Sequence, residues 1–282
     1  MKRIGLILHA ENPEAAETGR WLARALGERG VEVQAPVADV ERLGAGAVTA
    51  VEAFADDLDL VVALGGDGTL LRAVAAIQHP GPPLLGVNFG HLGFLSQMER
   101  SELAGGLATV LDGAFDIDER MMLEARLDGG EQFPALNEVI VEKSSVGRAI
   151  RLSVAIGGEP VASWLADGLI VATPTGSTAY SFSAGGPVVA PAVPCLVVTP
   201  VAPHGVFNRT LVVPPGEEVL VRVLPGSDAA SLSADGRAAV DVPPGSDVRV
   251  RAALAPVRLA RVDGSPFWKL VREKFRLYVE DA

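Results

Sequence analysis

Several residue types are scarce in this chain, and each scarcity narrows what it can be. Among its 282 residues there is one cysteine, Cys195, so no disulfide can form within the chain and a reducing compartment is expected. Aromatic residues make up only 5%, so the cores must be built from Val, Leu, Ile and Ala. No apolar stretch reaches the roughly 18 residues that a membrane span needs. We therefore expect a cytoplasmic protein without a membrane segment.

Lysine is also scarce, and the positive charge is almost all arginine, scattered along the chain. The net charge of −11 repels a nucleic-acid backbone, because phosphate binding needs clustered Lys and Arg. Anionic membranes are poor partners for the same reason. Neither nucleic acid nor a membrane is therefore an expected partner.

The first part of the chain alternates between strand and helix patterns. Short apolar runs predict four buried strands, and helical periodicity predicts three helices. In chain order these segments are 4–9, 14–28, 31–33, 58–64, 69–77, 84–87 and 101–111. Because strands that alternate with helices form parallel sheets with crossover helices, we predict an α/β domain with a parallel sheet over residues 1–115.

Beyond this domain, alternating apolar residues and turn signals replace the helical periodicity. No helix is expected between about residues 120 and 262, which predicts an all-β domain over residues 116–264. Helical spacing returns over residues 266–279, and such an isolated helix needs an apolar surface to cover. We predict that the C-terminal segment, residues 265–282, packs back on the first domain.

The sharpest motif is Gly65-Gly66-Asp67-Gly68, which follows a buried strand and opens a helix. Glycines let the backbone turn tightly and approach a ligand closely, and a helix start presents N–H groups that suit phosphate. Because acidic residues rarely cradle phosphate, Asp67 indicates a base toward a hydroxyl nucleophile, or a metal ligand. The alternative is an ordinary corner in which Asp67 caps the helix.

Two further segments carry polar groups that suit a ribose and its phosphates. The stretch from Asp167 to Tyr180 leads from a strand into a turn of Thr, Ser and Gly, whose hydroxyls and amides fit such oxygens. A polar surface loop is the alternative. The pair Asn137-Glu138 interrupts an apolar run, which costs stability unless both side chains find partners. A solvated strand end would also explain that pair.

Other phosphate-binding and catalytic motifs are absent. The sequence has no G-x-x-x-x-G-K-[ST] loop and no G-x-G-x-x-G after its first strand, which disfavours P-loop and Rossmann enzymes. It also lacks G-x-S-x-G and H-E-x-x-H, so serine-hydrolase and zinc-protease functions have no support. The histidines lack metal-ligand spacing, and no protein metal site is expected.

The three motifs occur in the order and approximate spacing of NAD kinases, which phosphorylate the 2′-hydroxyl of the adenosine ribose of NAD. The stretches Gly90-His91-Leu92-Gly93-Phe94-Leu95 and Ser265-Pro266-Phe267-Trp268 also resemble this family. The resemblance therefore covers nearly the whole chain. The first motif alone is shared with diacylglycerol, sphingosine and 6-phosphofructo-kinases, so it is the combination that is specific.

The resemblance implies a role for each matching residue. Asp67 would be the base that polarises the ribose hydroxyl, and Asp167 would hold the nicotinamide ribose. Phe94 would stack on adenine, and Arg72 would meet phosphate unless it is an ordinary solvated helix residue. The other residues implied in substrate binding are Gly68, Asn137, Glu138, Arg148, Thr178, Ala179, Tyr180, Ser183, Ala202 and Arg237.

Some positions vary in the family that the chain resembles, and Asp235-Gly236-Arg237 aligns with a variable substrate-contact segment. Arg148 falls where members differ, often at a neighbouring subunit's site. Phe89 stands where many relatives have arginine, so the resemblance gives that position no phosphate role.

The implied reaction uses ATP, as a complex with a divalent cation such as Mg²⁺, and yields NADP and ADP. Polyphosphate as the donor is left open, and family members form homodimers or homotetramers. Two other functions remain to be weighed. A lipid or sugar kinase could share the glycine turn but would not need Asn137-Glu138 or the Asp167–Tyr180 stretch. A dinucleotide-sensing module could keep those contacts but would not need Asp67.

Overall fold

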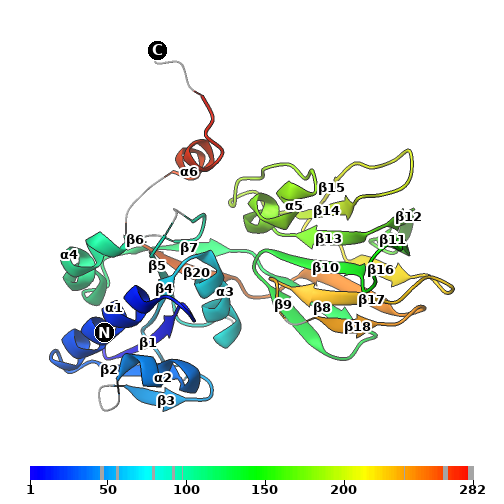
Figure 1. Ribbon diagram of the computed structural model, residues 1–282. Coiled ribbons are helices and arrows are strands. Elements are labelled where there is room, and N and C mark those ends of the chain that lie inside the picture. Colours follow the sequence, from blue (N-terminus) through cyan, green and yellow to red (C-terminus); the bar gives the residue numbers. More distant parts are fainter. Residues whose placement is uncertain are drawn as a thin grey trace. The chain divides into compact units, whose positions relative to one another are not determined.

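The computed structural model describes residues 1–44, 48–54, 57–77, 80–90, 93–96, 98–237, 239–262 and 266–278. The chain forms two compact units (Figure 1): unit 1 is Met1–Glu119 with Val257–Ala282, and unit 2 is Arg120–Pro256.

Unit 1 is built on an eight-stranded sheet, in which the strands Arg3–Leu8, Leu60–Gly65 and Leu84–Asn88 are largely apolar and buried. Six strand pairs in it are parallel, and Ile4 at its centre is paired with Val33 on one side and Leu60 on the other. The short strand β6 (Met98–Glu99) pairs with β5 at one end. The remaining strands, in order across the sheet, are β3 (Thr49–Val51), β2 (Glu32–Pro36), β1 (Arg3–Leu8), β4 (Leu60–Gly65), β5 (Leu84–Asn88), β20 (Val257–Arg261) and β7 (Asp116–Arg120).

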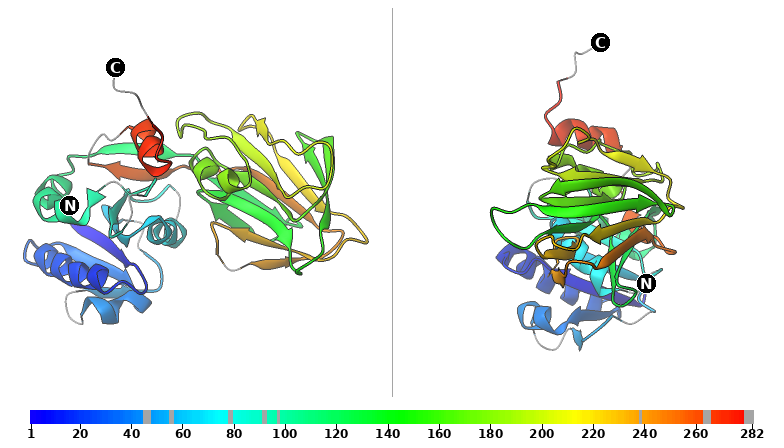
Figure 2. Two further views of the ribbon diagram at one scale, coloured as in Figure 1. Left: turned by 45° about the horizontal axis from the view of Figure 1, so that its top comes forward. Right: turned by 90° about the vertical axis from the view of Figure 1, so that its right-hand side faces the viewer.

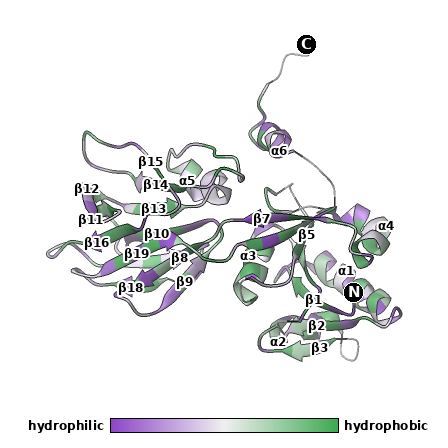
Figure 3. Cartoon of the chain, turned by 180° about the vertical axis from the view of Figure 1, so that it is seen from behind, coloured by the Kyte–Doolittle hydropathy of each residue, from purple (hydrophilic) through white to green (hydrophobic). Residues whose placement is uncertain are grey.

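Helices bury the apolar strands of this sheet. The amphipathic α1 shares one core cluster with α4, β1 and β4, and most of β1 is coloured as hydrophobic (Figure 3). Asn12 caps α1 by accepting from the amides of Glu14 and Ala15. The helices of unit 1 are α1 (Pro13–Gly27), α2 (Val37–Leu43), α3 (Asp67–Ala76), α4 (Arg100–Leu111) and α6 (Phe267–Lys274).

The strand β20 differs from the sequence-based expectation. The predicted boundary at residue 264 assigns it to the all-β domain, but β20 pairs in parallel with β5, with Leu259 opposite Leu84. The chain thus returns to the first sheet before α6 begins. Of the C-terminal segment 265–282, residue 265 and residues 279–282 lie outside the described residues.

Unit 2 consists of two six-stranded antiparallel sheets, which are seen as separate layers in Figure 2. Inward-facing residues of both sheets form one apolar core that includes Leu152, Trp164 and Leu169. One sheet has the order β15 (Leu211–Val213), β14 (Leu196–Val201), β13 (Gly168–Ala172), β10 (Glu138–Lys143), β17 (Ala230–Ala234), β18 (Val240–Val242). The other has the order β12 (Glu159–Ala166), β11 (Ile150–Ile156), β16 (Val219–Val223), β19 (Asp247–Ala252), β8 (Leu123–Leu127), β9 (Gln132–Ala135).

The expectation that unit 2 has no helix is wrong in one place. The stretch after β13 forms a 3₁₀ turn over Thr175–Thr178 and the short helix α5 over Tyr180–Ser183. Ala184 and Val189, just beyond α5, pack on a second apolar cluster that contains Ile170 and buried Cys195. The Thr-Pro-Thr-Gly-Ser-Thr sequence is too short for helical periodicity to mark this turn.

The predicted fold class is confirmed: an α/β unit with a parallel sheet, an all-β unit, and a C-terminal helix that belongs to the first unit. Among the described residues, none of the helices is both long enough and apolar enough to cross a membrane.

Candidate active site

The glycine turn connects the carboxyl end of β4 to the first residue of α3. Gly65 must be glycine, because a Cβ there would lie 2.1 Å from Oγ1 of Thr69. Gly66 is the N-cap residue of α3, in an extended conformation and without a side-chain cap. Asp67 is therefore the first helical residue and not the cap, so the alternative of a simple Asp cap does not describe this corner.

The carboxylate of Asp67 is held by the backbone of a neighbouring loop. Its Oδ2 accepts a hydrogen bond from the amide of Phe94 at 2.9 Å, and its Oδ1 accepts one from the amide of Leu95 at 3.2 Å. The α-carbon of Gly93 lies so close that a Cβ there would be 1.9 Å from Oδ1. The side chain thus has a fixed orientation. His91 and Leu92, earlier in the same loop, lie outside the described residues.

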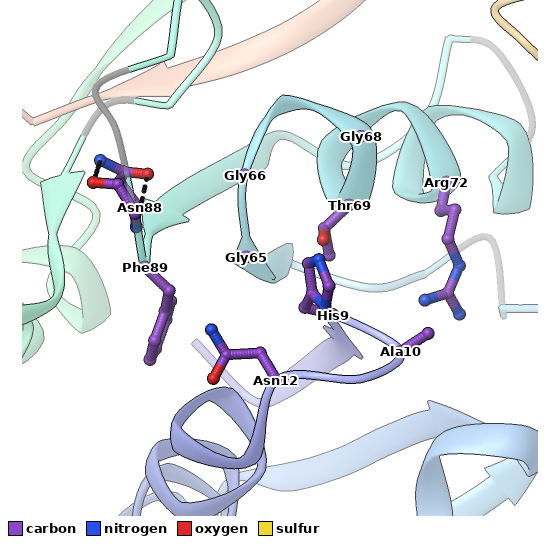
Figure 4. Close-up of a pocket in the computed structure, with 11 residues that line it drawn as sticks. His9, Ala10, Asn12, Gly65, Gly66, Gly68, Thr69, Arg72, Asn88 and Phe89 are labelled. Carbon is purple, nitrogen blue, oxygen red and sulfur yellow. Dashed lines mark hydrogen bonds between the residues drawn. The ribbon is translucent and has the colours of Figure 1, made fainter.

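A cavity of about 350 Å³ opens beside this turn (Figure 4). The parallel strands β1, β4 and β5 end at the same edge of the sheet, so the residues that follow them converge there. The first turn of α3 adds amides that have no partner within the helix. The lining residues are His9, Ala10, Asn12, Gly65, Gly66, Gly68, Thr69, Arg72, Asn88, Phe89 and Gly90, without Asp67.

Arg72 lies in the lining of this cavity and is anchored to the end of β1. Its guanidinium donates to the carbonyl of Leu8 at 2.7 Å and lies 3.5 Å from the carboxylate of Asp39. Asp39 is buried and also accepts from the amide of Leu8. Since 44% of the Arg72 side chain remains exposed, it can still meet an anion in the cavity. Arg72 is therefore more than a solvated helix residue.

Two phenylalanines near the turn have partners that the sequence does not indicate. Phe89 lines the cavity, and the guanidinium of Arg100 lies 5.8 Å from its ring centroid. Phe94, expected to stack on adenine, has its ring 6.3 Å from that of Phe267 and 5.9 Å from that of Phe275. Any contact of Phe94 with adenine must use the part of the ring that α6 leaves free.

In unit 2, Asn137 directly precedes β10, Glu138 is its first residue, and the pair is held by Asp235. One carboxylate oxygen of Asp235 accepts from the amide of Leu136 at 2.7 Å, and the other accepts from the amides of Asn137 at 2.8 Å and Glu138 at 3.1 Å. Asp235 has φ 51°, a left-handed conformation that aspartate tolerates better than most residues. This single carboxylate fixes the backbone of the motif.

The turn after β13 holds the same pair from another direction. The carbonyl of Asn137 accepts from the amide of Thr173 at 2.8 Å, and that of Leu136 accepts from the Thr173 hydroxyl at 2.6 Å. Gly176 donates to the same hydroxyl oxygen at 3.0 Å. A Cβ on Gly176 would lie 2.0 Å from the carbonyl oxygen of Asn137, so the two predicted motifs are in direct contact and need glycine there.

Glu138 stands in an environment that disfavours its negative charge. Burial, and then repulsion from Asp235, raise the pKa of Glu138 to about 7, although the amide of Tyr180 opposes this shift. Its Oε2 is buried without a hydrogen-bond partner. Burial also raises the pKa of Asp235, against the effect of its three amide donors. Near neutral pH, Glu138 is thus divided between its two protonation states.

This raised pKa predicts a pH dependence of stability. Between about pH 4.5 and 7 the folded protein keeps the Glu138 proton that the unfolded chain loses, so stability should fall as pH rises through this window. The loss of stability should reach at most about 3.5 kcal/mol, at about 1.4 kcal/mol per pKa unit. Urea unfolding of the wild type and of Glu138→Gln at pH 5 and pH 8 measures it. Equal pH slopes for the two proteins would contradict the assignment.

Asp167 and Ala202 lie at the other end of β10 from this pair, because Glu142 is paired with Gly168 and the amide of Lys143 donates to the carbonyl of Asp167. The amide of Asp167 donates to the carbonyl of Val201, which places Asp167 next to Ala202, a residue with φ 45°. Asp167 also forms a 2.7 Å ion pair with Lys143. Burial raises the pKa of the Tyr180 phenol, and the carboxylates that add to the shift are those of Glu142, Asp167 and Glu138. The negative charges of two expected residues, Asp167 and Glu138, and of Glu142 thus all act on this phenol.

The remaining expected residues divide into two groups. Thr178, Ala179 and Ser183 lie in the turn and α5, partly or fully exposed beside Tyr180. Arg148 and Arg237 instead have structural partners: Arg148 lies 3.3 Å from Asp228 on an exposed loop, and Arg237 donates to the carbonyls of Ala234 and Pro134.

Asp235 is the residue that sequence reasoning missed. The Asp235-Gly236-Arg237 stretch draws attention to its arginine, but the aspartate is the one that contacts the Asn137-Glu138 motif. The sequence signal that points to it is the Asp-Gly pair directly after a strand of alternating apolar residues. An aspartate in such a turn often accepts hydrogen bonds from nearby backbone amides. Among the described residues, no group of three or more His, Cys, Asp or Glu side chains is arranged to hold a metal ion.

Comparison with known proteins agrees with this geometry. Residues 4–115 match the family model of the ATP-NAD kinase N-terminal domain, and residues 136–262 match that of the ATP-NAD kinase C-terminal domain. The NAD kinase of Symbiobacterium thermophilum is 42% identical over 279 residues, which cover 97% of this chain and 99% of the relative.

Two solved structures share the fold. The NAD kinase of Archaeoglobus fulgidus, in complex with ATP, has a TM-score of 0.76 and 25% identity, with 97% of this chain and 98% of that chain covered. The yeast NADH kinase, complexed with NADH, has a TM-score of 0.87 and 24% identity, with 98% and 87% covered. The matched domains, the full-length relative and the gathered motifs agree, and the chain belongs to the NAD kinase family.

Proposed function

We propose that this chain transfers the γ-phosphoryl group of ATP to the 2′-hydroxyl of the adenosine ribose of NAD, with Asp67 as the base that orients this hydroxyl. The observation that carries the proposal is the fixed carboxylate of Asp67 at the first residue of α3, in a glycine turn. A new bond joins the 2′-oxygen to phosphorus, while the bond from the γ-phosphorus to its bridging oxygen breaks. The hydroxyl proton passes to the carboxylate, and ADP leaves.

The cavity beside the turn is the proposed place for the phosphates of the donor. Gly66 and Gly68 leave the backbone open, the start of α3 favours negative charge, and Arg72 supplies a cation. ATP is the proposed donor. Polyphosphate presents the same phosphate chemistry, so comparing NADP formation with each donor at equal phosphate concentration separates them.

A divalent cation, Mg²⁺ in our proposal, enters with ATP. Such a cation is typically held by one or two carboxylates and the substrate phosphates, so it does not require a dedicated cage of protein ligands. It would neutralise charge on the β- and γ-phosphates during transfer. The protein's own part is to position the two substrates.

Unit 2 is the proposed NAD site. Asn137 and Glu138 would bind the adenosine part, and Asp167 would hold the nicotinamide ribose beside Ala202. The turn and α5 would line the site through Thr178, Ala179, Tyr180 and Ser183. The contacts of Asp235 and Thr173 with Asn137-Glu138 support this role, because they preorganise the pair. For Arg148 and Arg237 a substrate contact would require exchanging their present partners. We further propose a cytoplasmic homodimer or homotetramer.

The choice of acceptor tests this proposal against kinases that share the glycine turn. With ATP and Mg²⁺, we expect NAD to be phosphorylated and diacylglycerol, sphingosine and fructose 6-phosphate to remain unchanged. The reason is that the gathered groups of unit 2 suit a dinucleotide. Transfer of ³²P from γ-labelled ATP measures the phosphorylation of all four acceptors in the same assay. Label on a lipid or sugar, with NAD inert, would overturn the proposal.

A further inference from the structure

The Gly93–Phe94–Leu95 loop and helix α6 together fix the orientation of Asp67. We propose that this loop is the positioning device of the catalytic carboxylate, and that α6 holds the loop in place through the ring of Phe94. The proposal rests on the role proposed above for Asp67 and extends it to residues that would not touch the substrate's reacting atoms.

The two amide contacts leave the carboxylate little freedom. Each oxygen of Asp67 accepts one backbone N–H, from Phe94 and from Leu95, so rotation about the side-chain bonds would break both hydrogen bonds. An ionised carboxylate has about four lone-pair sites, so each oxygen can still accept a hydroxyl proton. The loop therefore orients the carboxylate without occupying it.

Gly93 makes this arrangement sterically possible. A Cβ at position 93 would lie 1.9 Å from Oδ1 and 2.6 Å from Cγ of Asp67, well inside van der Waals contact. Any other residue would displace either the carboxylate or the loop. A displacement of about 1 Å at a reacting group can cost about 10²-fold in rate.

Phe94 connects the loop to the C-terminal helix. Its amide binds Asp67, while its ring packs between Phe267 at the start of α6 and Phe275 just after its end. The ammonium of Lys274 lies 5.6 Å from the same ring centroid. Leu270 and Val271 of α6 are buried. One residue thus joins α6 to the carboxylate, so a change in α6 can reach Asp67 through the backbone of Phe94.

Gly93→Ala tests the device, with Gly105→Ala as the matched control. Gly105 is an exposed residue of α4, where a Cβ would meet no atom within 4 Å. We expect Gly93→Ala to lower kcat about 10- to 100-fold with the KM for NAD changed by less than about threefold. In an Asp67→Asn background, Gly93→Ala should lower kcat by less than about threefold, because the two residues act as a unit. Gly105→Ala should leave kcat and KM unchanged.

Phe94→Leu is the second variant, and it decides the question if Gly93→Ala does not fold. It keeps the amide and an apolar side chain but removes the ring contacts with α6, so kcat should fall about 3- to 10-fold at constant KM. A raised KM with an unchanged kcat would instead mark Phe94 as an adenine contact and overturn its role in the device.

The failures of the two proposals are distinguishable. A fully active Asp67→Asn would overturn the proposed base itself. An inactive Asp67→Asn together with a Gly93→Ala variant as active as Gly105→Ala would leave the base in place and overturn the positioning device.

Discussion

Replacing Asp67 with asparagine should lower the kcat of NADP formation by about 10²- to 10⁴-fold, the usual effect of removing a positioned acid or base. The amide keeps the shape of the side chain and one acceptor oxygen, so the variant should fold normally. It loses the charge that attracts and receives the hydroxyl proton, and also one of the two backbone hydrogen bonds, because the NH2 group cannot accept from Phe94 or Leu95. Steady-state NADP formation at saturating ATP and NAD measures the effect.

Calorimetric NAD binding separates chemistry from positioning in this variant. Binding should be retained, because the proposed NAD contacts lie in unit 2. Asp116→Asn, at an exposed position in β7, is the matched loss of one negative charge and should keep full activity. A loss of less than about tenfold in kcat would remove Asp67 from its role. Binding lost together with activity would mark it as a residue that positions the substrate.

Gly176→Ala should destabilise unit 2 by about 3–5 kcal/mol. The added methyl would lie 2.0 Å from the carbonyl oxygen of Asn137, which already accepts from Thr173. Overpacking a tight site costs about 1–3 kcal/mol, and each buried hydrogen bond broken by the displacement adds about 1–3 kcal/mol. The free energy of unfolding in urea measures the loss, and the affinity for NAD should fall with it because Asn137 moves.

Gly216→Ala is the control for this change. Gly216 is exposed in the turn before β16, and a Cβ there would meet no atom within 4 Å. Gly216→Ala should change the free energy of unfolding by less than about 1 kcal/mol. Equal free energies of unfolding for the two variants would show that the Gly176 turn does not depend on its approach to Asn137.

The fold class could be predicted because its signals are local. The buried runs of β1, β4 and β5 are continuously apolar, as expected for strands covered on both faces, and the helices between them carry amphipathic periodicity. The alternation of strands such as β11 and β19 likewise marks a sheet with one buried face. These patterns of apolar residues can be recognised in a single sequence without knowledge of the structure.

Elements that depend on distant partners could not be predicted. The strand β20 has the same apolar alternation as the strands before it, and only its pairing with β5 assigns it to unit 1. The helix α2 is seven residues long, too short for its period to stand out, and it follows Pro36 directly. The 3₁₀ turn over Thr175–Thr178 is held through Thr173, which bonds to Leu136 and Asn137 and accepts from the amide of Gly176.

The candidate site likewise combines residues that the sequence points to with contacts that it does not reveal. The residue types of the motifs point to their chemistry, so Asp67, Asn137 and Tyr180 could be proposed as site residues from the chain alone. Their orientation is set by residues with no such signal: the amides of Phe94 and Leu95 hold one carboxylate, and Asp235 holds one backbone segment. These are contacts between segments far apart in the sequence, and residue type alone does not reveal them.

The most direct test of the account is the product formed from ATP, Mg²⁺ and NAD. Mass spectrometry should show NAD with one added phosphate, and ³¹P NMR should show a new monoester on the 2′-oxygen of the adenosine ribose. Asp67→Asn, assayed beside the wild type, should form this product at least about 10²-fold more slowly. A folded wild-type protein that forms no NADP, or that phosphorylates another hydroxyl, would contradict the account.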